Sequence, residues 1–206
     1  MNKVLLIGFE PFAGYPSNPS ADLIWEAVRQ GQEGWQIDVA ILPVRWREIH
    51  AALCNALTQS EPQWVLAFGL AANRQAISLE RVAINLLDFS LPDNTGVKIT
   101  EQAILPGGVA AYFSGLPLRR LNAALIGAGI PTEISCTAGT FCCNQAFYLL
   151  AHESNDWQRF RGGFIHLPCT PDLAAQIGKT TSIALHTMRQ ALTVILATLE
   201  ERADPT

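Results

Sequence analysis

The sequence predicts an α/β protein with three layers (α/β/α), built around an open, twisted, mostly parallel sheet with an antiparallel hairpin excursion. Strand-like apolar runs alternate with amphipathic runs over most of the 206 residues, which is typical of βαβ units around a parallel sheet. Residues 64–69 are apolar without alternation, as expected of a strand covered by helices on both faces.

The first seventy residues predict three strands separated by two helices. The strands are expected at 3–8, 35–42 and 64–69, and Pro43 ends the second of them. The helices are expected at about 18–30 and 45–58. In the first helix, Leu23, Ile24, Ala27 and Val28 share one face.

The middle of the chain predicts a departure from this alternation. Residues 76–91 are expected to be extended, to turn at 91–96 and to return at 97–104 as a hairpin. A helix is expected at about 117–128, a strand at 134–136 and a helix from near 139 to about 153. A last strand at 163–167 is stopped by Pro168, and a final helix runs from about 171 or 180 to 201.

Composition indicates one catalytic domain over residues 1–206, because 49% apolar and 16% charged residues supply a large core. The net charge of −4 argues against broad nucleic-acid binding, which needs clustered Lys and Arg. The first apolar run is too short for a signal peptide, and no window approaches the roughly 18 apolar residues of a membrane span. We therefore expect a cytoplasmic protein that binds no membrane, with its five cysteines reduced.

The strongest local signal for chemistry is the run 136–144, in which small residues lead from a strand directly into a helix. Cys142 and Cys143 fall in the first turn of that helix. Unpaired backbone N–H groups and the helix dipole favour an anion there, which predicts a lowered cysteine pKa and a site for an oxyanion. Adjacent residues point about 100° apart, so only one of the two can face the site. Local physics does not choose between them, and both also suit the core.

A cysteine nucleophile needs a base, and His166 is the candidate among four histidines. It lies at the carboxyl end of an apolar strand, the edge at which open α/β sheets bind ligands. His50, His152 and His186 lie within predicted helices and are interpreted as ordinary helix-surface residues. Glu80, an acid within an extended apolar run, is the candidate to orient the imidazole. The alternative role for Glu80 is a salt bridge to Arg74 or Arg81, with no part in orienting the imidazole.

No metal site and no nucleotide cofactor are expected. His166 and Cys169 have ligand-like spacing, but no second ligand pair accompanies them. Neither glycine-rich phosphate-binding pattern occurs in the chain.

Several segments together resemble the pyroglutamyl peptidase I (pyrrolidone carboxyl peptidase) family of cysteine peptidases. They are 8–14, 18–20, 69–71, 80–85, 92–94, 137–144 and 162–168. The resemblance implies a triad of Cys143, His166 and Glu80, and it settles the choice of cysteine, because the family's nucleophile directly precedes the Asn of this run. It also implies removal of an N-terminal pyroglutamyl residue through a thioester, with no cofactor.

A pyroglutamyl residue is a neutral lactam, so its site should be small, apolar and dry. The resemblance places the substrate-binding residues at Phe9, Phe12, Asn18, Leu70, Leu91, Phe141 and Cys142. It further implies a homo-oligomer, a dimer or tetramer, and the region 90–110 is expected to expose Leu91, Ile104, Leu105 and the nearby Tyr112.

The chain departs from the family's pattern at three places. Ser90 stands where many members have Arg, Ala72 and Asn73 replace two glycines, and Ala13 replaces another. Ser90 motivates the main alternative, a weakened or inactive pyroglutamyl-binding homologue. A phosphorylase-like transferase and a redox protein using Cys142 and Cys143 are the others.

Overall fold

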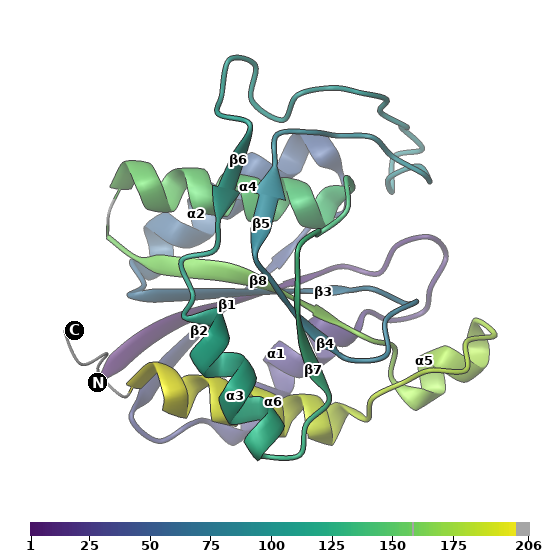
Figure 1. The fold of residues 1–206 in the computed structure, drawn as a ribbon. Helices are drawn as coiled ribbons and strands as arrows, with labels where there is room; N and C mark the ends of the chain where they lie inside the picture. Colours follow the sequence, from purple (N-terminus) through teal and green to yellow (C-terminus); the bar gives the residue numbers. More distant parts are fainter. Residues whose placement is uncertain (158, 201–206) are drawn as a thin grey trace.

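The computed structural model describes residues 1–157 and 159–200, and it confirms the α/β prediction (Figure 1). A six-stranded sheet has the order β2-β1-β3-β8-β4-β7. The strands are β1 (Asn2–Phe9), β2 (Trp35–Leu42), β3 (Trp64–Leu70), β4 (Ile77–Glu80), β7 (Thr132–Ser135) and β8 (Arg161–Leu167). Neighbouring strands pair in parallel except for β4 and β8, which are antiparallel.

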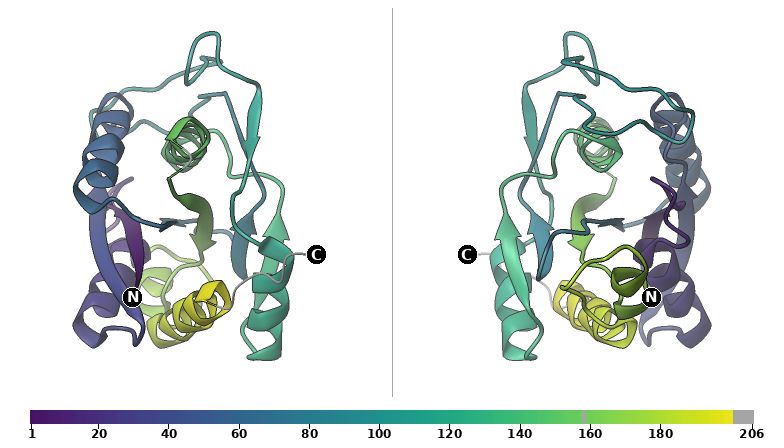
Figure 2. Two further views of the ribbon diagram at one scale, coloured as in Figure 1. Left: turned by 90° about the vertical axis from the view of Figure 1, so that its left-hand side faces the viewer. Right: turned by 90° about the vertical axis from the view of Figure 1, so that its right-hand side faces the viewer.

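Helices cover both faces of the sheet, as Figure 2 shows from the two sides. On one face lie α1 (Pro19–Gln30), α3 (Leu118–Gly127) and α6 (Leu185–Glu200). On the other lie α2 (Trp46–Ser60) and α4 (Cys142–Trp157). No helix in the described part of the chain has the length and apolarity to cross a membrane.

Alternation along each strand divides the core between the two faces. In β1, Val4 and Leu6 pack toward α1 and α6, whereas Leu5 and Ile7 pack toward α2 and α4. All four side chains are at most 1% exposed. Alternate side chains of β1 point to opposite faces of the sheet, and helices cover both faces, so every residue of the run is buried. This explains why the strand is apolar throughout.

The hairpin excursion exists, and it contains two antiparallel pairings, of which the sequence predicted one. β5 (Val82–Ile84) pairs antiparallel with β6 (Ala111–Phe113), and not with residues 97–104. Residues 97–104 return antiparallel to the residues before the turn, as predicted. Leu87 and Gln102 exchange two backbone hydrogen bonds, and the Phe89 N–H donates to the Ile99 carbonyl. The buried Asn144 of α4 hydrogen-bonds to the backbone of Ile84 and Leu86. Docking onto α4 thus holds β5 in place.

The side chains expected to be exposed near this hairpin are partly buried instead. Ile104, Leu105 and Tyr112 pack against the core beside α4. The exposed large apolar side chains here are Val97, Val109 and Phe113, with exposed fractions of 39%, 53% and 78%. The long loop folds back onto α4, and this contact could not be inferred from local periodicity.

The final helical region consists of two helices, α5 (Pro171–Gln176) and α6. The left-handed Gly178, with φ of 69°, lies between them. The predicted start at 171 coincides with the start of α5, whereas the alternative start at 180 precedes the start of α6 at Leu185 by five residues. The expected last residue, 201, lies outside the described residues.

Candidate active site

His166 and Glu80 come from the neighbouring antiparallel strands β8 and β4. The register places Ser78 opposite His166, so Glu80 lies one diagonal step away on the same face. Glu80 Oε1 lies 2.7 Å from His166 Nδ1, and both side chains are buried. A carboxylate can only accept a hydrogen bond, so Nδ1 of the neutral ring carries the hydrogen and Nε2 remains an acceptor.

Arg74 is a second partner of Glu80. Its Nη2 lies 2.9 Å from Glu80 Oε1 and also donates to the Thr137 carbonyl, while its Nη1 contacts Glu133 at 3.2 Å. Glu80 therefore contacts both of its predicted partners, the imidazole of His166 and the guanidinium of Arg74. A positive charge beside Glu80 offsets part of the cost of burying this carboxylate.

Cys143 is the second residue of α4, where the sequence placed it. Its sulfur lies against Gly69 of β3: a Cβ atom added at Gly69 would be 2.8 Å from Cys143 Sγ. Gly69 is the register partner of His166, and paired residues project side chains to the same face. The thiol, the imidazole and the carboxylate thus come from a helix start and two strands that meet on one face of the sheet.

The predicted lowering of the Cys143 pKa is wrong for the protein without substrate. Burial of the thiol, followed by the negative charge of Glu80, raises the pKa of Cys143 to about 12. Burial likewise raises the pKa of Cys142, which packs in the core. Loss of water around the sulfur outweighs the helix dipole, whose effect is about 0.3–1 kcal/mol at an exposed site. Cys143 is therefore a neutral thiol in the protein without substrate.

This raised pKa predicts how Cys143 reacts with iodoacetamide. Because only the thiolate reacts, the alkylation rate at Cys143 should rise about tenfold per pH unit between pH 7 and 9, without a plateau. The rate is measured site by site by mass spectrometry, with the exposed Cys136 as internal reference. A plateau below pH 7, with Cys143 reacting faster than Cys136, would show a preformed thiolate–imidazolium pair and contradict this prediction.

Gly69 belongs to a segment that carries the family resemblance, but its position against Cys143 was not predicted, although a glycine near the end of a buried strand is a signal of close approach. In Gly69→Ala, the new Cβ would lie 2.8 Å from both Cys143 Sγ and Phe164 Cζ. Phe164 is fully buried, so the sulfur has to move. A displacement of about 1 Å costs about 100-fold in rate. We expect kcat to fall about 100-fold, measured with the pyroglutamyl substrate that the family resemblance implies.

Gly162→Ala is the matched control for this substitution. Its Cβ would lie 3.0 Å from the Val65 carbonyl oxygen, at the amino end of β8 and away from Cys143. Both variants should lose stability from overpacking, by about 1–3 kcal/mol. Only Gly69→Ala should lose turnover. Equal losses of kcat would mean that overpacking, and not the nucleophile's position, limits the rate.

An apolar cavity lies beside Cys143 and contains most of the predicted substrate-binding residues. Its walls are Phe9, Phe12, Asn18, Val44, Leu70, Phe141, Cys142 and Cys143. It is narrow, and no more than about one water molecule fits between the walls. Phe12 and Phe141, whose ring centroids are 6.0 Å apart, are only half-buried. Admission of a larger group therefore requires these two rings to move.

Three residues of this region differ from expectation. Leu91 is half-buried but does not line the cavity. Asn18 lines the cavity, but its side-chain amide already donates a hydrogen bond to the Glu10 carbonyl and accepts one from Ser20, which caps α1. Val44 lines the cavity and was missed, although its place directly after β2 puts it at the same sheet edge.

The departures from the family's glycine pattern have different consequences. Ala72 and Asn73 keep negative φ angles, so the loop carries Arg74 to Glu80 without needing glycine. Ala13 instead has φ of 55°, a conformation that costs a residue with a Cβ about 1–2 kcal/mol. Ser90 is exposed.

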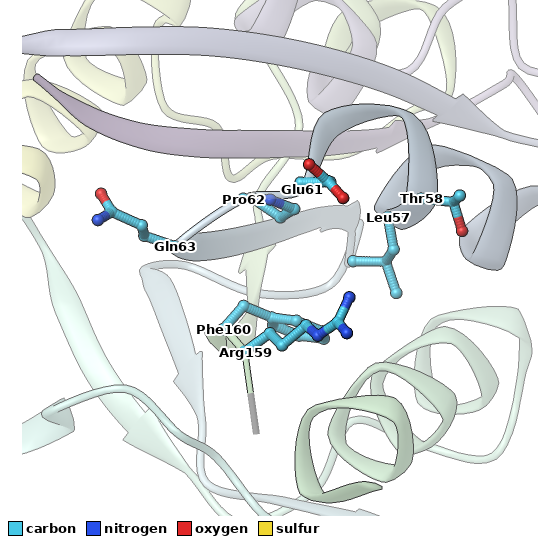
Figure 3. Close-up of a pocket in the computed structure, with 7 residues that line it drawn as sticks. All are labelled: Leu57, Thr58, Glu61, Pro62, Gln63, Arg159 and Phe160. Carbon is cyan, nitrogen blue, oxygen red and sulfur yellow. The ribbon is translucent and has the colours of Figure 1, made fainter. Parts of the chain in front are cut away.

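A larger hollow lies elsewhere, at the amino ends of β3 and β8 (Figure 3). Its walls are Leu57, Thr58, Glu61, Pro62, Gln63, Arg159 and Phe160. No thiol or imidazole is among them, and open α/β sheets bind ligands at the opposite ends of their strands. The site is therefore assigned to the narrower cavity beside Cys143.

An α/β sheet carrying a helix-start thiol, an imidazole and a buried carboxylate defines the class of cysteine-type hydrolases. The profile of the family described as pyroglutamyl peptidase matches residues 2–202, and the chain belongs to this family. It is 42% identical to the pyrrolidone-carboxylate peptidase of Clavibacter michiganensis, over 99% of this chain and 96% of that one. Identity to the Pseudomonas fluorescens enzyme is 45%, over 91% and 88%.

Solved structures agree with the sequence relatives. Pyroglutamyl peptidase I from Bacillus amyloliquefaciens superposes with a TM-score of 0.94 at 35% identity, over the whole of both chains. A mutant pyrrolidone carboxyl peptidase from Pyrococcus furiosus gives 0.91 at 35% identity, over 97% of this chain and 99% of that one. None of these relatives supports the inactive homologue or the phosphorylase-like transferase.

Proposed function

We propose that this chain removes the N-terminal pyroglutamyl residue from peptides, with Cys143 as nucleophile, His166 as general base and acid, and Glu80 as the residue that orients His166. The observation that carries the proposal is the 2.7 Å contact between Glu80 and His166, on the face where Cys143 Sγ lies against Gly69. Names of the relatives support the same activity.

The raised pKa of Cys143 decides the order of the proton transfers. His166 Nε2 takes the thiol proton as the sulfur attacks the carbonyl that joins pyroglutamate to the next residue. Backbone N–H groups in the first turn of α4, which lack intrahelical partners, hold the oxyanion. His166 then protonates the leaving amine. Water, deprotonated by His166, hydrolyses the resulting thioester and restores the thiol.

Substrate selection follows from the walls of the cavity. Phe9, Phe12, Leu70 and Phe141 offer apolar surface and no carboxylate to pair with an ammonium group. A lactam enters such a site without bringing a charge. An N-terminal glutamine or glutamate would bury its ammonium group unpaired, which costs several kcal/mol. Cys142 and Asn18 line the same cavity, whereas Leu91 is not among its lining residues.

The test uses three fluorogenic amides and the reduced protein. The pyroglutamyl amide should be cleaved, while the glutaminyl amide should be cleaved at least 100-fold more slowly and the prolyl amide no faster than the glutaminyl one. Failure to cleave the pyroglutamyl amide would overturn the proposal. Cleavage of all three at similar rates would leave a cysteine peptidase but reject the lactam-specific pocket.

We also infer that the chain is one catalytic domain and acts as a homo-oligomer in the cytoplasm. The family match from 2 to 202 supports one domain, and five free thiols suit a reducing compartment. The exposed Val109 and Phe113 offer apolar surface for association with another copy. Light scattering of the purified protein measures its oligomeric state, and a monomer at micromolar concentration would contradict this inference.

A further inference from the structure

A cluster of three metal-ligating side chains lies between α2 and α4, away from the proposed active site. His50 and Cys54 are four residues apart on α2 and share one face of that helix. Glu153 faces them from α4. The Nε2 of His50 lies 2.9 Å from Glu153 Oε1, and the Cys54 thiol donates to the same oxygen at 3.6 Å. The three ligand atoms all lie within 4.8 Å of one another.

We propose that His50, Cys54 and Glu153 bind a divalent transition-metal ion of the Zn²⁺ class. Zinc–ligand bonds of about 2.0–2.3 Å in tetrahedral geometry place neighbouring ligand atoms about 3.3–3.6 Å apart. The sulfur–oxygen distance already has this value, and the nitrogen–oxygen distance needs to open by only a few tenths of an ångström. Side-chain rotations that also bring the sulfur and the nitrogen, which lie within 4.8 Å of each other, to about 3.6 Å complete three corners of a tetrahedron.

The chemistry of the three donors selects the ion. Imidazole, thiolate and carboxylate together are typical ligands of Zn²⁺ and Co²⁺, whereas Ca²⁺ and Mg²⁺ require sets of oxygen ligands. The His50 side chain is 45% exposed and Glu153 only 11%. Solvent thus reaches the cluster from the His50 side, which leaves the fourth position to water.

Binding involves proton exchange and no redox change. Burial, and then the charge of Glu153, raise the pKa of Cys54 to about 11, so without a metal the sulfur holds its proton. The ion takes up the Cys54 sulfur, His50 Nε2 and a Glu153 oxygen, and one proton passes to solvent.

The location indicates a stabilising role and not a catalytic one. Glu153 lies ten residues after Cys143 on α4, about 15 Å along the helix. The ion would cross-link α2 to the helix that carries the nucleophile. A ligand that binds only the folded state stabilises it by mass action. At a Zn²⁺ concentration 100 times the dissociation constant, Tm should rise by roughly 5–10 °C.

Co²⁺ is the spectroscopic probe, because a thiolate bound to it gives a charge-transfer band in the near ultraviolet. The intact protein should bind one Co²⁺ with this band, and so should Cys136→Ser and Cys143→Ser, which remove an exposed thiol and the proposed nucleophile. Cys54→Ser should lose the band. His50→Asn, at a half-exposed position, should bind Co²⁺ at least 100-fold more weakly.

Three outcomes would overturn the proposal. They are absence of Co²⁺ binding to the intact protein, persistence of the band in Cys54→Ser, and loss of the band in Cys143→Ser. The last would place the ion at the nucleophile. Circular dichroism and Tm without metal establish that Cys54→Ser and His50→Asn are folded. The readout is spectroscopic, so it does not depend on the proposed peptidase activity.

Discussion

Replacing Cys143 with serine is expected to lower kcat/KM toward a pyroglutamyl reporter by at least 10⁴-fold, the scale on which loss of a nucleophile acts in comparable triads. An alcohol is a far weaker acid than a thiol, and the burial that raises the pKa of Cys143 opposes an alkoxide more strongly still. Steady-state kinetics measure the loss. The unfolding transition should change little, because one oxygen replaces one sulfur in a half-buried side chain.

Cys142→Ala is the matched comparison, because it removes the adjacent thiol. Cys142 is 1% exposed and packs with the core beside α4. It also lines the cavity, so KM is expected to change, but turnover should persist. Loss of turnover in Cys142→Ala with retention in Cys143→Ser would reverse the assignment of the nucleophile.

Replacing Glu80 with glutamine is expected to lower kcat by about 10³–10⁴-fold, the magnitude seen when the acid of a triad becomes an amide. An amide can present its NH₂ group to Nδ1, which moves the ring hydrogen to Nε2 and removes the acceptor that Cys143 needs. The substitution also leaves Arg74 without the carboxylate 2.9 Å away. Both the kinetics and the pH–rate profile should change.

Glu133→Gln separates the loss of the imidazole partner from the disturbance of Arg74. Glu133 contacts Arg74 Nη1 at 3.2 Å and accepts a hydrogen bond from Ser78, without touching His166. Because Glu133 is largely exposed, its ion pair contributes little. The kcat of the Glu133→Gln variant should stay within about twofold of that of the unsubstituted protein. An equal loss in Glu133→Gln would assign the effect of Glu80 to the position of Arg74.

Local sequence was sufficient for elements whose partners lie nearby in the chain. β2 was predicted with its correct ends, and β1, β3 and α2 to within two residues, because apolar periodicity and Pro43 act on the segment itself. The position of Cys143 in the first turn of a helix followed from the same local signals. The choice of Cys143 over Cys142 came from the family resemblance and not from local physics.

Contacts between distant segments decided the rest. Residues 97–104 return beside 87–89 as predicted, but the pairing of β5 with β6 at 111–113 was not predicted. Asn144 and the core beside α4 hold β5 in place, and both belong to distant parts of the chain. Glu80 and His166 are 86 positions apart, and their contact depends on an antiparallel step within a mostly parallel sheet. The approach of Gly69 to Cys143 and the alignment of His50 and Cys54 with Glu153 were equally invisible to periodicity.

The pKa of Cys143 shows most directly which properties follow from local sequence and which depend on the tertiary structure. Its helix-start position, readable from residues 136–144, favours an anion. The packing of Gly69, Phe164 and Glu80 around the sulfur removes water and adds negative charge, and these effects prevail. Propensity and periodicity act over a few residues, so they place a side chain on an element. Solvation and charge depend on everything that surrounds it, so the chemistry of that side chain is set only when the chain has folded.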